Sequence, residues 1–101
     1  MKILGIDPGT NIMGFGVVSW NGSTPLVIEH GVLRINDKTP FDKLKHILNE
    51  VSVWIKKHCV DHVAIEAPFY DKNAQSMLKL GRAQGVAITS AINQDVSVYE
   101  Y

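Results

Sequence analysis

The sequence predicts an α/β domain in which a five-stranded mixed sheet, with strand order 3-2-1-4-5, carries two helices on one face. The first third of the chain has the pattern of three strands joined by hairpins, and the remainder alternates helix, strand, helix and strand. Strands reached through a helix need long crossovers, so the two later strands should run parallel to a strand already in the sheet. Right-handed crossovers that progress in one direction place both helices on the same face.

The three N-terminal strands are expected at residues 3–6, 14–20 and 26–35. The first is a short apolar run formed by Ile3, Leu4 and Ile6, which is typical of a strand buried on both faces. Asn21-Gly22 separates the second and third strands and is a strong hairpin signal, because both residues tolerate positive φ angles. Gly31 marks an expected bulge in the third strand.

A first helix should begin after Thr39, which is a suitable N-cap, with Pro40 at its first position. Lys56 and Lys57 near its end favour the negative pole of the helix dipole. Its apolar residues share one face, which we expect to lie on the sheet: Phe41, Leu44, Ile47, Leu48, Val51, Trp54 and Ile55.

A second, longer helix is expected at residues 73–93, between strands at residues 61–67 and 96–101. It has two apolar stripes. The stripe expected to pack on the sheet contains Ala74, Met77, Leu78, Gly81, Gly85, Ile88 and Ile92. We expect the flatter stripe to meet a second helix across a homodimer axis, although a further part of the same chain is an alternative; its candidate interface residues are Leu80, Ala83, Ala87 and Ala91.

Bulk composition sets outer limits on function. A chain of 101 residues is one domain at most, and its formal net charge of zero means that any nucleic-acid contact must use a local basic patch. The single Cys59 excludes an internal disulfide and fits a reducing compartment. No apolar run is long enough to cross a membrane, and no signal peptide is evident, so we expect a cytoplasmic protein without a membrane partner.

Two carboxylates follow buried strands. Asp7 ends the first strand and precedes the tight Pro8-Gly9 turn, and Glu66 ends the fourth. If these strands pair, the carboxylates meet at one edge of the sheet, where like charges raise a pKa or recruit a divalent cation. Mg²⁺, with Mn²⁺ as a substitute, suits such oxygen ligands and could activate water for phosphodiester hydrolysis. The alternative is an Asp-Pro-Gly turn without chemistry.

The predicted topology also leaves one face of the sheet uncovered. Because the first strand is apolar at consecutive positions, it requires burial on both sides. We therefore expect residues 1–101 to form a single domain that is incomplete at its C-terminal end.

Three motifs resemble the RuvC family of bacterial Holliday-junction resolvases, and the resemblance extends over the whole chain. They are ILGIDPGT at the start, VAIEAPFYDKNAQSMLKLGRAQGVAI in the middle and VYEY at the end. The resemblance implies an RNase H-like fold and a homodimeric, Mg²⁺-dependent endonuclease that cuts four-way DNA junctions in recombination and repair. It also implies cooperation with a branch-migration helicase complex.

By resemblance, Asp7 and Glu66 are the first two catalytic carboxylates and metal ligands, and Phe69 contacts bases at the junction. Phe69 could instead be a core aromatic residue, and Lys79 and Arg82 a solvated helix face. Thr10 could contact the scissile phosphate or merely cap its own turn. The full set of predicted DNA-binding residues is Thr10, Phe69, Tyr70, Lys72, Asn73, Lys79 and Arg82.

The family has further acidic or histidine ligands in a C-terminal helix and basic residues after the last strand, and both regions lie beyond this sequence. We therefore expect the 101-residue chain to be inactive alone. Two other hypotheses remain: a non-catalytic DNA-structure-binding or dimerisation module, and a phosphate-binding fragment of an actin-like ATPase or sugar kinase. The latter predicts ATP binding at residues 7–10.

Overall fold

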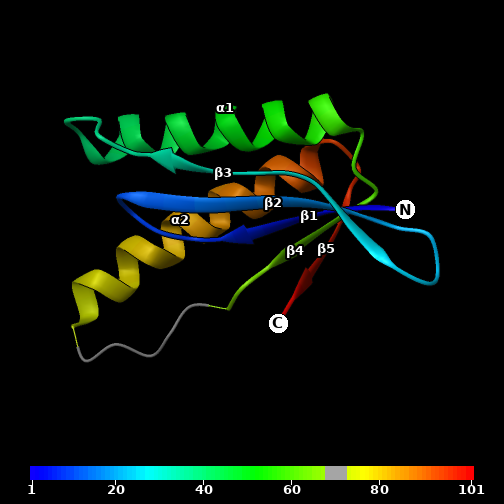
Figure 1. The fold of residues 1–101 in the computed structure, drawn as a ribbon. Helices are drawn as coiled ribbons and strands as arrows, with labels where there is room; N and C mark the ends of the chain where they lie inside the picture. The colour runs from blue at the N-terminus through cyan, green and yellow to red at the C-terminus, as the bar shows by residue number, and fades with distance from the viewer. Residues whose placement is uncertain (68–72) are drawn as a thin grey trace.

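A computed structural model describes residues 1–67 and 73–101, which form five strands and two helices (Figure 1). Neither helix combines the length and apolarity that crossing a bilayer requires. The elements, in chain order, are β1 (Lys2–Asp7), β2 (Ile12–Trp20), β3 (Pro25–Arg34), α1 (Pro40–His58), β4 (His62–Ile65), α2 (Ala74–Asn93) and β5 (Ser97–Glu100).

The strand order in the sheet is β3-β2-β1-β4-β5, as predicted. β1 pairs antiparallel with β2 and parallel with β4, and β4 pairs parallel with β5, so the sheet is mixed. β1 lies at its centre because the hairpins build outward from one of its edges and the crossovers build outward from the other. The carboxyl ends of β1, β4 and β5 consequently point in the same direction (Figure 1).

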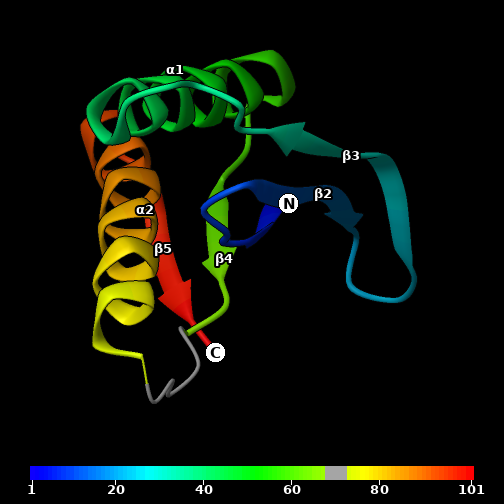
Figure 2. The same ribbon diagram turned by 90° about the vertical axis from the view of Figure 1, so that its left-hand side faces the viewer.

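Both helices pack on one face of the sheet and form the hydrophobic core with it (Figure 2). Strand residues alternate between this core and the opposite face, which no helix covers in the described part of the chain. We call that opposite side the open face. Its existence was predicted. The fully or nearly fully buried core side chains include Leu4, Ile6, Met13, Phe15, Val17, Ile47, Val51, Ile55, Val63 and Ile65.

α1 starts as the sequence predicts. The Oγ1 atom of Thr39 accepts a hydrogen bond from the Asp42 main-chain N–H at 3.2 Å, and Pro40 occupies the first turn. Phe41, however, was expected on the sheet side and is 76 % exposed. The packed part of α1 begins one turn later, at Leu44, because the first turn lies beyond the core.

The β2–β3 hairpin turns through Asn21, as expected. Its Oδ1 atom accepts hydrogen bonds from the main-chain N–H groups of Ser23 and Thr24, while Gly22 has a φ of +96°. The predicted bulge at Gly31 is wrong, because the pairing register shifts between Val17 and Val18 and leaves Ile28 as the extra residue.

Gly31 has a different use. A Cβ atom there would lie 3.5 Å from the Trp54 ring, which stacks on Phe15 with ring centroids 5.0 Å apart. The α1 tryptophan thus lies against the sheet at Gly31, where a Cβ atom would make an ordinary van der Waals contact with its ring.

The two stripes of α2 have the reverse of their predicted roles. Ala83, Ala87 and Ala91 were predicted at a dimer interface but are at most 1 % exposed, because they pack inside the core beside α1. Small side chains here let the two helices approach closely, and the buried Ser90 Oγ donates a hydrogen bond to the Leu48 carbonyl at 2.9 Å. Leu80 is half-buried. Most of the stripe predicted to face the sheet is instead exposed, although Ile88 packs partly against the core.

This assignment predicts that Ala87→Leu destabilises the folded chain by about 1–3 kcal/mol, because extra methylenes would be forced into a packed core. Thr89→Leu is the matched control, since Thr89 is exposed on the same helix and surface changes typically stay within about 0.5 kcal/mol. Urea denaturation of the two variants measures the difference. Equal stability would contradict the inward orientation of this stripe.

Candidate metal and DNA-binding site

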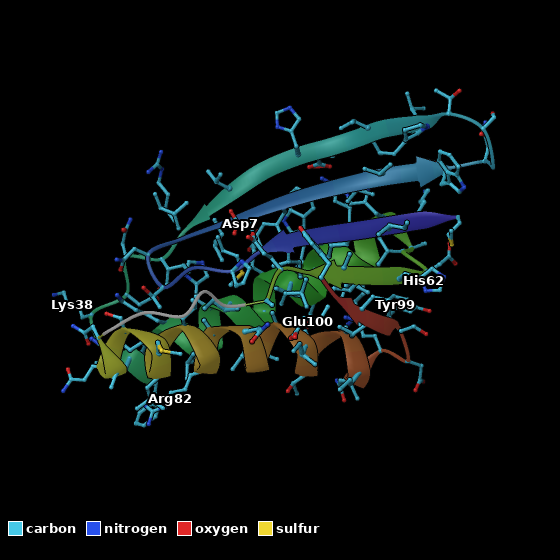
Figure 3. All side chains as sticks on the ribbon, turned by 90° about the horizontal axis from the view of Figure 1, so that it is seen from below. Asp7, Lys38, His62, Arg82, Tyr99 and Glu100 are labelled. Carbon is cyan, nitrogen blue, oxygen red and sulfur yellow. The ribbon has the colours of Figure 1, made fainter. Side chains whose placement is uncertain are left out.

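Parallel pairing of β1 with β4 brings Asp7 and Glu66 together, as predicted. Ile6 is opposite Ile65 in the register, and the Glu66 main-chain N–H donates to the Ile6 carbonyl at 3.2 Å. The two carboxyl groups therefore leave neighbouring strands at the same edge, close enough for Asp7 to raise the pKa of Glu66. Figure 3 shows Asp7 at the end of its strand.

The pair is electrostatically unfavourable when both groups are ionised. The pKa of the Glu66 carboxyl lies above its usual value of 4.5, firstly because of its hydrogen bond to Asp7, then because of partial burial and the charge of Asp7. Either a shared proton or a cation relieves this repulsion. The residues thus fit a hard divalent cation, which commonly takes one or two carboxylates and keeps several waters.

The pair is only part of a metal site. Within residues 1–67 and 73–101, no group of three or more histidine, cysteine, aspartate or glutamate side chains could hold a metal ion together. Two carboxylates from Asp7 and Glu66 leave most coordination positions to water, substrate or other ligands.

The loop after Asp7 is sterically constrained. A Cβ atom on Gly9 would lie 1.9 Å from the Ile12 carbonyl oxygen, so only glycine allows the chain to turn back into β2. Gly14 lies opposite Asp7 in the antiparallel register and leaves room beside its side chain, where a Cβ would sit 3.5 Å from that of Asp7. Gly9 thus holds the loop close to β2, and Asp7 is exposed at the strand end.

Two residues near the pair were missed by sequence reasoning. Gln84, which is 8 % exposed, donates from Nε2 to the Glu66 main-chain oxygen at 3.3 Å and to Glu100 Oε2 at 3.1 Å. Glu100 is opposite Ile65 and so points toward α2, whereas Glu66, one residue on, points the other way. Glu100 therefore anchors Gln84 rather than adding a third ligand. The acidic end of the VYEY motif was the available signal, but its face depends on register.

The predicted DNA-binding residues fall into three groups. Thr10, Lys79 and Arg82 come together around one cavity. The Asn73 side chain caps α2, accepting hydrogen bonds from the main-chain N–H groups of residues 75 and 76 at 3.0 and 3.2 Å. Phe69, Tyr70 and Lys72 lie outside the described residues.

Comparison with known proteins identifies similar sequences along almost the whole chain. The family model described as crossover junction endodeoxyribonuclease RuvC matches residues 3–101. The chain is 48 % identical over 100 residues to the RuvC protein of Cytophaga hutchinsonii, covering 98 % of this chain and 50 % of that protein. It is 49 % identical over 100 residues to that of Bacteroides fragilis, covering 98 % of this chain and 53 % of that protein. The chain thus spans about half the length of these curated relatives.

Solved structures give the same fold. Thermus thermophilus RuvC in complex with a Holliday junction substrate has a TM-score of 0.92 and 25 % identity, with 100 % of this chain and 65 % of that chain covered. The yeast mitochondrial Holliday junction resolvase has a TM-score of 0.71 and 14 % identity, covering 97 % of this chain and 51 % of that chain, and so shares the fold. The predicted RNase H-like class is confirmed.

The coupled carboxylates predict that Asp7→Asn lowers the pKa of Glu66 toward 4.5, because it removes the neighbouring negative charge. The pKa of Glu66 is higher in the folded chain than in the unfolded chain. Its protonation therefore contributes folding stability that is fully present below about pH 4.5 and is lost as the pH rises through the folded-state pKa. Asp7→Asn should therefore reduce that loss. Carboxyl ¹³C NMR titration without divalent cations, with denaturation at each pH, checks both effects.

Glu50→Gln is the matched control. Glu50 lies on α1, away from the pair, and the substitution removes one negative charge there. An unchanged Glu66 titration in Asp7→Asn would contradict the coupling.

Proposed function

This chain belongs to the RuvC family of crossover junction endodeoxyribonucleases, and we propose that the protein cuts four-way DNA junctions by metal-dependent phosphodiester hydrolysis. The observation that carries the proposal is the juxtaposition of Asp7 and Glu66 at the ends of two parallel strands. Hard-oxygen pairs of this kind are suited to metal-assisted hydrolysis of phosphate esters.

In this proposal, Asp7 and Glu66 are metal ligands. Mg²⁺ is the proposed cation and Mn²⁺ its substitute, since both favour oxygen ligands. When bound, the cation supplies activation of water and neutralises charge on the reacting phosphate. Gln84 keeps the end of β4 fixed through the Glu66 carbonyl, so the ligand carboxylate keeps its position.

Substrate binding is proposed to combine base stacking with phosphate contacts. Phe69 would stack on an unpaired base, with Tyr70, Lys72 and Asn73 around it, because aromatic residues bind unpaired bases with little dependence on sequence. Thr10, Lys79 and Arg82 would contact the backbone. Their position around one cavity supports this part of the proposal.

We also propose that a segment outside residues 1–101 covers the open face and supplies the remaining metal ligands. The open face has a hollow of about 590 Å³, with Asp7 on its border and a floor that includes three glycines, Gly5, Gly14 and Gly16. Exposed apolar side chains continue across it, with Ile12 and Val32 51 % and 61 % exposed. The 101-residue chain alone is then inactive.

The proposed homodimer uses the outward stripe of α2 rather than the predicted small-residue stripe. Leu78 and Ile92 are 54 % and 62 % exposed, and a Cβ atom on Gly81 or Gly85 would meet no atom within 4 Å. These four residues lie along one side of the helix, and Ile88, between Gly85 and Ile92, packs partly against the core of its own chain. A second copy could approach the glycines closely and bury the two large side chains.

We further propose that the protein acts in recombination and repair, together with a branch-migration helicase complex, and that it is cytoplasmic. Both follow from the family resemblance and suit a DNA-processing enzyme.

We expect Asp7→Asn and Glu66→Gln, made in the full-length protein, each to reduce junction cleavage more than about 100-fold, because even the partners of metal ligands are typically worth roughly 10–100-fold. Junction binding should persist, since it depends mainly on shape and backbone charge. Cleavage of a labelled four-way junction in Mg²⁺, with a linear duplex as substrate control, measures the first effect; gel-shift titration measures the second.

The same assay on the 101-residue chain should give no cutting. Glu50→Gln should cut at the wild-type rate. Wild-type cutting by Asp7→Asn would contradict the site, whereas binding without cutting by the unmodified full-length protein would favour the non-catalytic module.

The dimer surface predicts that Leu78→Glu with Ile92→Glu turns the full-length protein into a monomer, because four carboxylates would be buried across a two-fold axis. Sedimentation equilibrium measures the mass. Thr89→Glu with Asn93→Glu is the charge-matched control on an exposed neighbouring face. A dimer that survived the first double variant would contradict this surface.

A further inference from the structure

A second feature of the carboxylate end is a basic cavity of about 220 Å³. It lies where the loop after β1, the start of α1 and the first half of α2 meet. In Figure 3, Lys38 and Arg82 lie at the end of the molecule toward which β1 points. The polar side chains of the cavity are those of Thr10, Asn11, Lys38, Lys43, Lys79 and Arg82.

Within the described part of the chain, the cations of this cavity form no ion pair with a carboxylate. Among residues 1–67 and 73–101, no carboxylate lies within 4.0 Å of Lys38, Lys43, Lys79 or Arg82. Asp37, the acidic residue next to Lys38, is instead bonded to His46 at 2.9 Å. Four cations around one small space in a chain of zero net charge favour an anionic ligand.

One of these cations is also held in position. The Lys43 Nζ atom donates to Asn11 Oδ1 at 3.1 Å, which joins α1 to the loop that follows Asp7. Thr10 adds a hydroxyl, and Arg82 adds a guanidinium whose fork can donate two hydrogen bonds to one phosphate. Hydroxyl, ammonium and guanidinium donors together suit phosphate oxygens.

We propose that this cavity binds one backbone phosphodiester of the cut DNA strand, distinct from the phosphate at Asp7 and Glu66. The proposal rests on the proposed nuclease function. Thr10 follows Asp7 by three residues, so their Cα atoms are at most about 11 Å apart. Because a strand advances about 3.4 Å per nucleotide along the duplex axis, the bound phosphate lies within a few nucleotides of the cut.

This assignment gives Lys38 and Lys43 a role. Held by the cavity, the strand keeps a fixed register relative to the carboxylates, and the cations offset the repulsion between the acidic pair and the DNA backbone. Lys38, just before α1, and Lys43, in its first turns, are therefore positioning residues for the reaction.

The test compares Lys38→Gln/Lys43→Gln with Lys45→Gln/Lys56→Gln in the full-length protein. Both double variants remove two positive charges, but Lys45 and Lys56 are exposed on α1 outside the cavity. Junction affinity is measured at several salt concentrations. The cavity variant should lower the slope of log K against log salt by about one unit, as expected for one lost phosphate contact, and the control should leave it unchanged. Thermal melting confirms that both variants fold.

A second experiment identifies which backbone phosphate of the DNA binds in the cavity. Single methylphosphonates, which are uncharged, are placed at successive positions on each side of the cut. Wild-type protein should lose affinity at one position in particular, and the cavity variant should show no further loss there. A profile that is identical in the two proteins overturns the assignment, as does an unchanged salt slope.

A free anion is the competing ligand. If inorganic phosphate raises the melting temperature of the wild type but not of the cavity variant, while both bind the junction equally, the cavity serves free anions and the DNA assignment is wrong. If unmodified protein neither binds nor cuts junctions, the nuclease proposal itself fails. Normal cutting with no effect of the cavity variant overturns only this inference.

Discussion

Parallel pairing between β1 and β4 is the constraint on which the rest of the structure depends. The hydrogen-bond ladder fixes two strand ends side by side, and each end carries a carboxylate. An isolated pair of like charges would separate in water, but here separation would require breaking the central strand of the sheet. The stability of the sheet therefore offsets the repulsion between the Asp7 and Glu66 carboxylates. A bound cation or a shared proton can relieve that repulsion.

α2 connects this constraint to the surrounding surfaces. Its inward alanines set how closely it approaches α1, and its buried Gln84 joins the ends of β4 and β5. Lys79 and Arg82, on its first turns, reach the cavity beside Thr10. A rotation of this helix about its axis would disturb the core, the carboxylate edge and the basic cavity together.

The sequence predicts strand order well because topology follows from a few strong rules. Helical crossovers enforce parallel pairing, and a short apolar strand ending in an acid is visible at both Asp7 and Glu66. The helix N-cap at Thr39 is equally local, since the side chain, the following proline and the first acidic residue are close in sequence.

The errors concern tertiary contacts. Alanines in α2 correctly indicated a close helix neighbour, but nothing in their spacing could reveal that the neighbour was α1 of the same chain rather than a second protomer. Gly31 indicated an irregularity in the strand, whereas in the structure it pairs regularly and lies against Trp54 from another element. Lys38 and Lys43 were overlooked because a cavity formed by three separated segments leaves no periodic pattern in any one of them.

The bulge at Ile28 has a consequence for the solubility of the chain. β3 is an edge strand, and Leu26, Val27 and Ile28 are 63 %, 61 % and 42 % exposed along it. A flat apolar edge of this kind offers unpaired main-chain groups to strands of other molecules and can seed aggregation. The extra residue bends the strand and interrupts the regular repeat of those groups, so the bulge protects the outer hairpin against edge-to-edge association.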